Sequence, residues 1–257
     1  MDSEQRIILV TGASRGIGAE TARVLAARGE HVIVNYREKR KRADAIVADI
    51  VAAGGSASAA GADIADPAAA RALIEGVVAE FGRLDVLVLN ASGGLERGAE
   101  ADYAMRLNRD AQERLVRLAV PHMGSGARIV FVTSHQAHFH GRKPVPADYV
   151  PIAASKRAGE DALRAMIPEL GTRGIDLVVV SGDMIDGTTI VVLLERRDPE
   201  AVALRRRVGE LPTVAQFATA VADAADSAGE SGRTVYVGGA DYVDAEGLPV
   251  PADGSAG

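Results

Sequence analysis

The feature that most constrains the fold is a glycine-rich turn, Gly12-x-x-x-Gly16-x-Gly18, close to the N-terminus. It stands between Arg6–Val10, an apolar run typical of a buried strand, and Gly16–Arg28, an amphipathic run typical of a helix. Gly12 permits a tight turn, and the other two glycines let the backbone approach a phosphate. The amides and dipole of a helix N-terminus then favour an anion. The turn therefore predicts an α/β fold with a dinucleotide site.

The rest of the chain repeats this alternation of strand and helix. The expected strands are Arg6–Val10, His31–Asn35, Ser58–Ala62, Leu84–Asn90, Arg128–Thr133, Asp176–Ser181 and Thr234–Val237. The expected helices are Gly16–Arg28, Lys39–Ala53, Pro67–Phe81, Tyr103–His122, Ile152–Leu170 and Val214–Ala225. Continuous Val/Ile/Leu runs are typical of parallel strands that are buried on both faces. We expect a single Rossmann-type doubly wound domain over residues 1–243, with a seven-stranded, mostly parallel sheet and helices on both faces.

Three segments depart from the alternation. Residues 135–149 hold three histidines and two prolines and are expected to form a loop. Residues 183–211 are charged and irregular, with a helix expected around Arg205-Arg206-Arg207. Both segments follow strand ends, where ligands bind in open α/β sheets, and the second should form a substrate lid. Residues 244–257 are small, acidic and rich in Pro and Gly, so we expect a flexible tail.

Composition excludes several classes of protein. A net charge of −6 over 257 residues argues against a nucleic-acid binder. No apolar run approaches the roughly 20 residues of a membrane span, and the polar N-terminus predicts no signal peptide, so a cytoplasmic protein is expected. The chain has no cysteine, which excludes disulfides and thiolate chemistry. Five of the six residues from Arg37 to Arg42 are basic, and this run is either a solvated helix start or a phosphate-facing patch.

The end of the second expected strand indicates which dinucleotide is bound. An acidic residue there would accept the ribose hydroxyls and repel a 2′-phosphate. The chain instead has Asn35-Tyr36-Arg37, and a second arginine, Arg15, stands inside the glycine turn. Two guanidinium groups that converge on one point can hold a phosphate through charge-assisted hydrogen bonds. We therefore expect NADP(H).

Further motifs resemble the short-chain dehydrogenase/reductase superfamily over about residues 6–240. Asp63 follows the third strand, Leu89-Asn90-Ala91 ends the fourth, and Asn108 lies in the fourth helix. Ser134 ends the fifth strand, and Ser155-Lys156 lies in the fifth helix. Ser181-Gly182 stands where the family has Pro-Gly, and Thr188 follows it as a candidate contact to the carboxamide of the nicotinamide. From the turn and the resemblance together, the expected cofactor-binding residues are Gly12, Ser14, Arg15, Gly16, Ile17, Gly18, Asn35, Arg37, Asp63, Ile64, Asn90, Ala91, Lys156 and Thr188.

The resemblance also implies the chemistry. In the family a tyrosine gives a proton to the developing alkoxide, a lysine lowers the pKa of that tyrosine, a serine orients the carbonyl and an asparagine holds a relay water. Asn108, Ser134 and Lys156 match these positions, but the tyrosine position, four residues before Lys156, is Ile152. Tyr149 stands seven residues before Lys156 and is our candidate donor.

Local geometry allows Tyr149 to take this role. Spacings of four and seven residues both return to one helix face. Because Pro151 disfavours helical geometry at Val150, we expect Tyr149 in the approach to the helix, carried over the nicotinamide by the preceding loop. The Tyr-x6-Lys spacing also resembles that of enoyl-thioester reductases of the same superfamily. The alternative is a loop tyrosine that only packs on the protein.

The histidines after Ser134 offer a second source of protons. His135 is a candidate auxiliary acid because imidazole titrates near neutral pH. His135, His138 and His140 have a spacing that could suggest a metal site, but no acidic partner is evident and no metal is expected.

Three functions remain open at this stage. The first is NADP(H)-dependent reduction of a carbonyl, in a 3-oxoacyl thioester or another ketone. The second is enoyl-thioester reduction, and the third is a catalytically silent NADP-binding regulatory or structural protein. The expected partners are a small-molecule substrate and a second copy of the chain, as a homodimer or homotetramer built on the fourth and fifth helices.

Overall fold

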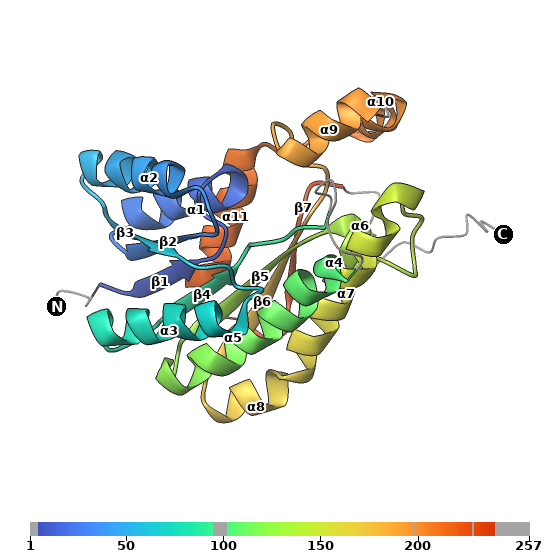
Figure 1. Cartoon of the computed structure of the whole chain (residues 1–257). Coiled ribbons are helices and arrows are strands. Elements are labelled where there is room, and N and C mark those ends of the chain that lie inside the picture. Colours follow the sequence, from blue (N-terminus) through green and yellow to red (C-terminus); the bar gives the residue numbers. More distant parts are fainter. Residues whose placement is uncertain (1–4, 95–101, 198, 228, 240–257) are drawn as a thin grey trace.

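The sheet has seven strands in the order β3-β2-β1-β4-β5-β6-β7, and every neighbouring pair is parallel. The computed structural model describes residues 5–94, 102–197, 199–227 and 229–239 (Figure 1). The strands are β1 Ile7–Val10, β2 His31–Tyr36, β3 Ser56–Gly61, β4 Val86–Leu89, β5 Arg128–Ser134, β6 Asp176–Gly182 and β7 Thr234–Val237. The doubly wound α/β fold expected from the sequence is therefore confirmed.

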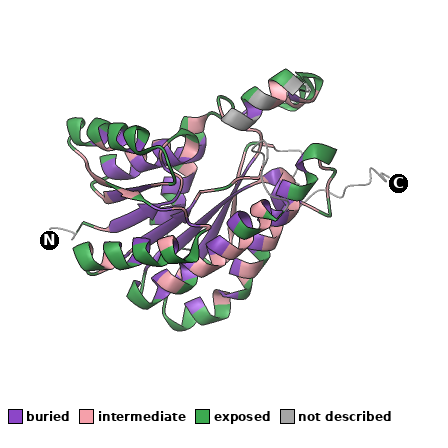
Figure 2. Cartoon of the chain, in the orientation of Figure 1, coloured by how far each residue is buried: buried purple, intermediate pink, exposed green. Residues whose placement is uncertain are grey.

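Helices cover both faces of the sheet, and the side chains of successive strand residues alternate between them. On one face lie α1 (Gly16–Ala27), α2 (Arg40–Ala52) and α11 (Val214–Asp226); on the other lie α3 (Pro67–Phe81), α5 (Ala111–Ala119), α7 (Val150–Ala165) and α8 (Ile167–Thr172) (Figure 1). Along β5, Val130 and Val132 join the core under α1 and α11, whereas Ile129 and Phe131 join the core under α5 and α7. The central strands are buried, the edge strands β3 and β7 are only partly buried, and α2 and α3 have exposed outer faces (Figure 2). Burial of each such side chain contributes about 1.5–3 kcal/mol.

The start of α3 follows the sequence. Asp66 is the N-cap, and its side chain accepts hydrogen bonds from the amides of Ala68 and Ala69. Pro67 occupies the first turn, where its missing N–H removes no helical hydrogen bond.

The expected helix Tyr103–His122 is interrupted. It consists of α4 (Tyr103–Met105), a π-helical turn (Arg106–Asp110), α5 and a 3₁₀ turn (Val120–His122). The π turn lies against α7 at Gly159, where a Cβ atom would stand 2.0 Å from the Asn108 carbonyl oxygen. The two backbones are therefore in direct contact at this point, and the irregular turn packs against α7.

The segment 135–149, expected as a loop, is partly helical. It contains α6 (His135–His138) and a 3₁₀ turn (Ala147–Tyr149), and α7 begins immediately after it at Val150. The expectation that Pro151 keeps Val150 out of helical geometry is wrong, because Val150 has φ −52° and ψ −47°. Pro151 lies in the first turn of α7, where a proline is tolerated.

The segment after β6 forms two helices, α9 (Thr189–Arg197) and α10 (Pro199–Val208), which project beyond the carboxyl end of the sheet (Figure 1). Arg205 of α10 forms a largely buried ion pair with Asp183, just after β6, with Nη2 and Oδ2 2.8 Å apart. The helix expected around Arg205 is thus present, whereas the tail expected over 244–257 lies outside the described residues. Within the described ranges, no helix combines the length and apolar character needed to cross a membrane.

Candidate functional site

A cavity of about 710 Å³ lies at the carboxyl ends of the strands. Its position, beside β1 and β4 where the strand order reverses, is where α/β sheets bind ligands. Every residue that we expected to bind the cofactor lines it, as do three of the four expected catalytic residues, Ser134, Tyr149 and Lys156. Asn108 is not part of its wall.

The glycine turn forms one end of the cavity. Gly12 and Gly16 have φ of 63° and 55°, a conformation that favours glycine. A Cβ atom on Gly18 would stand 2.5 Å from Nδ2 of Asn90. That amide donates to the carbonyl of Thr11 at 2.9 Å, so Asn90 holds the strand end against the turn. The turn keeps the cradle that a phosphate group requires.

Asn35 supports the same turn from β2. It is buried, its Oδ1 accepts from the amide of Gly12 at 3.3 Å, and its Nδ2 donates to the carbonyls of Ala60 and Ala62 at 3.1 and 3.2 Å. The side-chain amide of Asn35 therefore stabilises the walls of the cavity.

Four cations line the cavity near this turn, and they are Arg15, Arg37, Lys39 and Arg42. The guanidinium of Arg37 contacts the carboxylate of Glu38 at 3.1 Å and donates to the hydroxyl of Tyr103. Arg40 instead pairs with Asp44, at 3.4 Å, and does not line the cavity. The whole basic run is exposed, and three of its cations line the cavity. That they face a phosphate stays a prediction.

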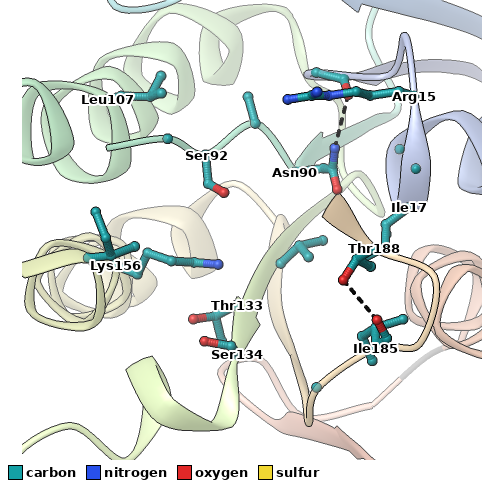
Figure 3. Close-up of a pocket in the computed structure, with 18 of the residues that line it drawn as sticks. Arg15, Ile17, Asn90, Ser92, Leu107, Thr133, Ser134, Lys156, Ile185 and Thr188 are labelled. Carbon is teal, nitrogen blue, oxygen red and sulfur yellow. Dashed lines mark hydrogen bonds between the residues drawn. The ribbon is translucent and has the colours of Figure 1, made fainter. Parts of the chain in front are cut away.

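Asp63 and Thr188 line the cavity at two different strand ends. Oδ1 of Asp63 accepts from the amide of Ala65 at 2.9 Å, which orders the loop after β3. Oγ1 of Thr188 donates to the carbonyl of Ile185 at 2.8 Å and accepts from the amide of Val191 at 3.4 Å, at the start of α9 (Figure 3). Both side chains thus have fixed positions.

Three functional groups line the chemical end of the cavity. The hydroxyls of Ser134 and Tyr149 lie 3.4 Å apart. Lys156 extends from α7 into the cavity, toward the end of β5 that carries Ser134 (Figure 3). Burial raises the pKa of Tyr149, against a smaller lowering by the Ser134 hydrogen bond, so its phenol is protonated at neutral pH. Burial lowers the pKa of Lys156 to about 8.

Ile152 lies beside these groups in the cavity wall, and its side chain is apolar. It is buried in a cluster with Ala104 and Tyr149. Its Cδ1 atom would be 2.5 Å from a Cβ on Gly94, so the isoleucine fills the space over that glycine. Because Ile152 has no hydroxyl, Tyr149 supplies the tyrosine hydroxyl at this end of the cavity among the described residues.

Asn108 is committed to other contacts. Its Nδ2 donates to the carbonyl of Gly93 and to Oγ of Ser155, both at 2.9 Å, and its Oδ1 accepts from the amide of Gly93 at 3.2 Å. The side chain therefore ties the segment after β4 to α7. Its expected part in proton relay stays a prediction.

Two of the three histidines, His135 and His138, are buried and hydrogen-bonded in the interior. Nε2 of His135 lies 3.0 Å from the carbonyl of Gly238 and so carries the proton, while Nδ1 accepts from Oγ of Ser181 at 2.8 Å. Burial lowers the pKa of His135, with smaller opposing effects, so the ring is neutral. His138 pairs with the buried carboxylate of Glu160, at 2.8 Å. Among the described residues no group of three or more His, Asp or Glu side chains could hold a metal ion.

The cavity has lining residues that the sequence did not single out. They include Ser92, Tyr103, Gln136, Asp183 and Arg205. Asp183 directly follows β6 and Ser92 comes three residues after β4, so their places near strand ends could have identified them. Nothing local indicated Tyr103, because it meets Arg37 from 66 residues away.

The set of groups fits a phosphorylated dinucleotide. At Gly16, which lines the cavity, a Cβ atom would enter space that no protein atom occupies, and the adjacent cations carry charge opposite to phosphate. At the other end, Lys156 and two hydroxyls can hold sugar and carbonyl oxygens.

Comparison with known proteins agrees with this geometry. A family model described as short chain dehydrogenase matches residues 6–226. The chain is 40% identical over 137 residues to an uncharacterized oxidoreductase of Methylorubrum extorquens, a match that covers 51% of this chain and 55% of the relative. It is 32% identical to 1-cyclohexenylcarbonyl-CoA reductase of Streptomyces collinus, over 91% of this chain and 86% of the relative. Among solved structures, the angucycline C-6 ketoreductase LanV with bound NADP superposes with a TM-score of 0.78 at 29% identity, over 91% of this chain and 95% of LanV.

Proposed function

The chain belongs to the short-chain dehydrogenase family of oxidoreductases, and from this premise we propose that it reduces the carbonyl group of a ketone or 3-oxoacyl thioester with NADPH. The observation that carries the proposal is the meeting of Ser134, Tyr149 and Lys156 at one end of a cavity whose other end has a phosphate cradle. The ketoreductase LanV, which has the same fold, supports carbonyl chemistry.

The cofactor, when bound, supplies a hydride to the carbonyl carbon. The developing negative charge on the carbonyl oxygen needs donors at fixed positions. Oγ of Ser134 donates a hydrogen bond to that oxygen and aligns it with Tyr149. The phenol of Tyr149 then gives its proton to the oxygen, which completes the alcohol. The ammonium of Lys156, which extends into the same cavity, stabilises the phenolate that remains.

The proposed preference for NADP(H) rests on charge. Arg15, Arg37, Lys39 and Arg42 line the same region, and they outnumber the carboxylate of Glu38 beside them. A 2′-phosphate would add negative charge where these cations lie. Bound NADP in the LanV structure supports the same choice.

Enoyl-thioester reduction is the second candidate, and two observations favour it. The Tyr-x6-Lys spacing resembles that branch of the superfamily. The relative from Streptomyces collinus, which matches 91% of this chain, is named for reduction of a cyclohexenylcarbonyl thioester. In that reaction Tyr149 would stabilise an enolate oxygen instead of an alkoxide.

The test is NADPH consumption with matched panels of ketones, 3-oxoacyl thioesters and enoyl thioesters. Turnover of ketones or 3-oxoacyl thioesters supports the first function, and turnover of enoyl thioesters alone supports the second. If NADPH binds but neither panel is reduced, the catalytically silent alternative is the better account.

We also propose a homodimer or homotetramer with α5 and α7 at the interface. The partly exposed outer faces of these helices would form a four-helix contact (Figure 2). Sedimentation velocity measures the assembly directly, and a monomer at micromolar concentration would contradict it.

A further inference from the structure

One contact spans the adenosine end of the cavity. A guanidinium N–H of Arg37, in the turn after β2, donates to the phenolic oxygen of Tyr103 at the start of α4. Both residues line the cavity, and 66 residues separate them in the chain. The contact therefore links the turn after β2 to α4 across the cavity.

The contact restricts a side chain that is partly exposed to solvent. The Arg37 side chain is 42% exposed, and it also contacts the carboxylate of Glu38, which is 60% exposed. A solvent-exposed arginine loses about 2 kcal/mol of rotamer entropy when it is fixed. Tyr103 removes part of that loss before a ligand arrives, and such preorganisation increases affinity.

Tyr103 is held in place by the packing of α4. The next residue, Ala104, is buried in the cluster that holds Ile152 and Tyr149. A Cβ atom on Gly94 would stand 2.6 Å from Cβ of Ala104, so α4 packs closely on the segment after β4. The phenol of Tyr103 thus extends toward Arg37 from a helix that is anchored at the chemical end.

We propose that Tyr103 is a cofactor-selectivity residue, whose hydroxyl positions the Arg37 guanidinium to bind the 2′-phosphate of the dinucleotide. The inference rests on the proposed NADP(H) site and adds a residue outside the glycine turn and outside the end of β2. It concerns binding alone, so its test needs no substrate.

The experiment measures the dissociation constants of NADPH, NADH, adenosine 2′,5′-bisphosphate and AMP by titration calorimetry on the full chain. The variants are Tyr103→Phe, Arg37→Ala and the double variant. Tyr36→Phe is the matched control, because it removes a phenolic oxygen one residue from Arg37, from a side chain that does not line the cavity. Circular dichroism and NADH affinity report whether each variant is folded.

We expect Tyr103→Phe to weaken NADPH and adenosine 2′,5′-bisphosphate by about 5-fold, since a hydrogen bond to a charged group is lost at a partly exposed site. NADH and AMP should bind as before, Tyr36→Phe should change nothing, and Tyr103→Phe should have no further effect in the Arg37→Ala background. An unchanged ratio of the NADPH and NADH dissociation constants in Tyr103→Phe would overturn the inference, and so would tighter NADPH binding. The proposed function would stand in either case. If the unmodified protein binds NADPH no tighter than NADH, the NADP(H) assignment and the inference fail together.

Discussion

Nδ1 of His138 and Oε2 of Glu160 lie 2.8 Å apart in the protein interior. His138 lies four residues after Ser134, and Glu160 lies four residues after Lys156. The other carboxylate oxygen of Glu160 accepts from Nε of Arg164, also at 2.8 Å. The pair therefore fixes α6 against α7 and sets how far the serine lies from the lysine.

Replacement of Glu160 should destabilise the protein most at neutral pH. Burial acts to raise the pKa of Glu160, but hydrogen bonds and charges of His138 and Arg164 outweigh it and hold the pKa below its usual range. A lowered folded-state pKa stabilises the protein above the ordinary value of about 4.3, and this stabilisation is lost as the pH falls through the lowered value. Glu160→Gln should reduce the free energy of unfolding by about 1–3 kcal/mol at pH about 7.

Urea denaturation at pH about 7 and about 3.5 measures this effect, and the cost of Glu160→Gln should shrink in acid. Glu113→Gln, which affects an exposed pair with Arg117 on α5, is the matched control and should cost at most about 0.5 kcal/mol. Equal costs for the two variants would show that the buried pair contributes no more than a surface pair.

Tyr149→Phe should lower kcat by about 10²- to 10⁴-fold, because the carbonyl oxygen loses its proton donor. NADPH affinity should be unchanged, since the lost hydroxyl contacts Ser134 at the chemical end. The measurement is steady-state kinetics on a ketone identified in the panel, beside NADPH titration, with Tyr36→Phe as the control. Full turnover by Tyr149→Phe would exclude Tyr149 as the donor.

The kcat/KM for reduction should fall as the pH rises through about 8. Burial lowers the pKa of Lys156 to about 8, and loss of its charge above that pH removes stabilisation of the phenolate and of the bound nucleotide. Because kcat/KM reports groups of the free enzyme, the fall should follow this value. Lys156→Met should have low activity at every pH, without the fall in kcat/KM at pH about 8. The same fall in that variant would show that another group titrates.

Arg205→Met should loosen α9 and α10, the segment expected to form a substrate lid. The mutation leaves Asp183 buried beside the end of β6 without its bidentate partner, a costly arrangement for a carboxylate. Amide hydrogen exchange in α9 and α10 should accelerate by at least tenfold, and the KM of a ketone substrate should rise. Arg206→Met is the control, because Arg206 pairs with Asp186 and Glu195 at the exposed surface. The same exchange rate in both variants would show that the buried ion pair does not hold the lid.

The order of elements could be predicted because the strands have a strong local signal. Val/Ile/Leu runs located five of the seven strands to within one residue at each end, and β4 to within two. The remaining strand, β3, begins at Ser56 instead of Ser58, since its small residues give no apolar boundary. Most of the site followed from the same logic, because parallel strands bring their carboxyl ends, and so Gly12, Asn90 and Ser134, to one edge.

The parts that could not be predicted depend on contacts between distant residues. His135 meets Gly238 from 103 residues away and His138 meets Tyr236 from 98, so nothing near them in the sequence distinguishes structural from catalytic histidines. The π turn likewise depends on α7, which no periodicity within residues 103–122 could reveal. The rule for the residue before a proline failed at Val150, because the 3₁₀ turn Ala147–Tyr149 continues directly into α7 and the Val150 amide donates to the Pro146 carbonyl at 3.1 Å.

The absence of a side chain at Gly159 has a consequence for engineering. Any larger residue there would push α7 away from the Asn108 carbonyl, and it would move Lys156, three residues earlier, out of register with Ser134. Libraries that aim at new substrates should therefore leave position 159 invariant. They should diversify α9 and α10, where side chains can change without displacing the helix that carries the lysine.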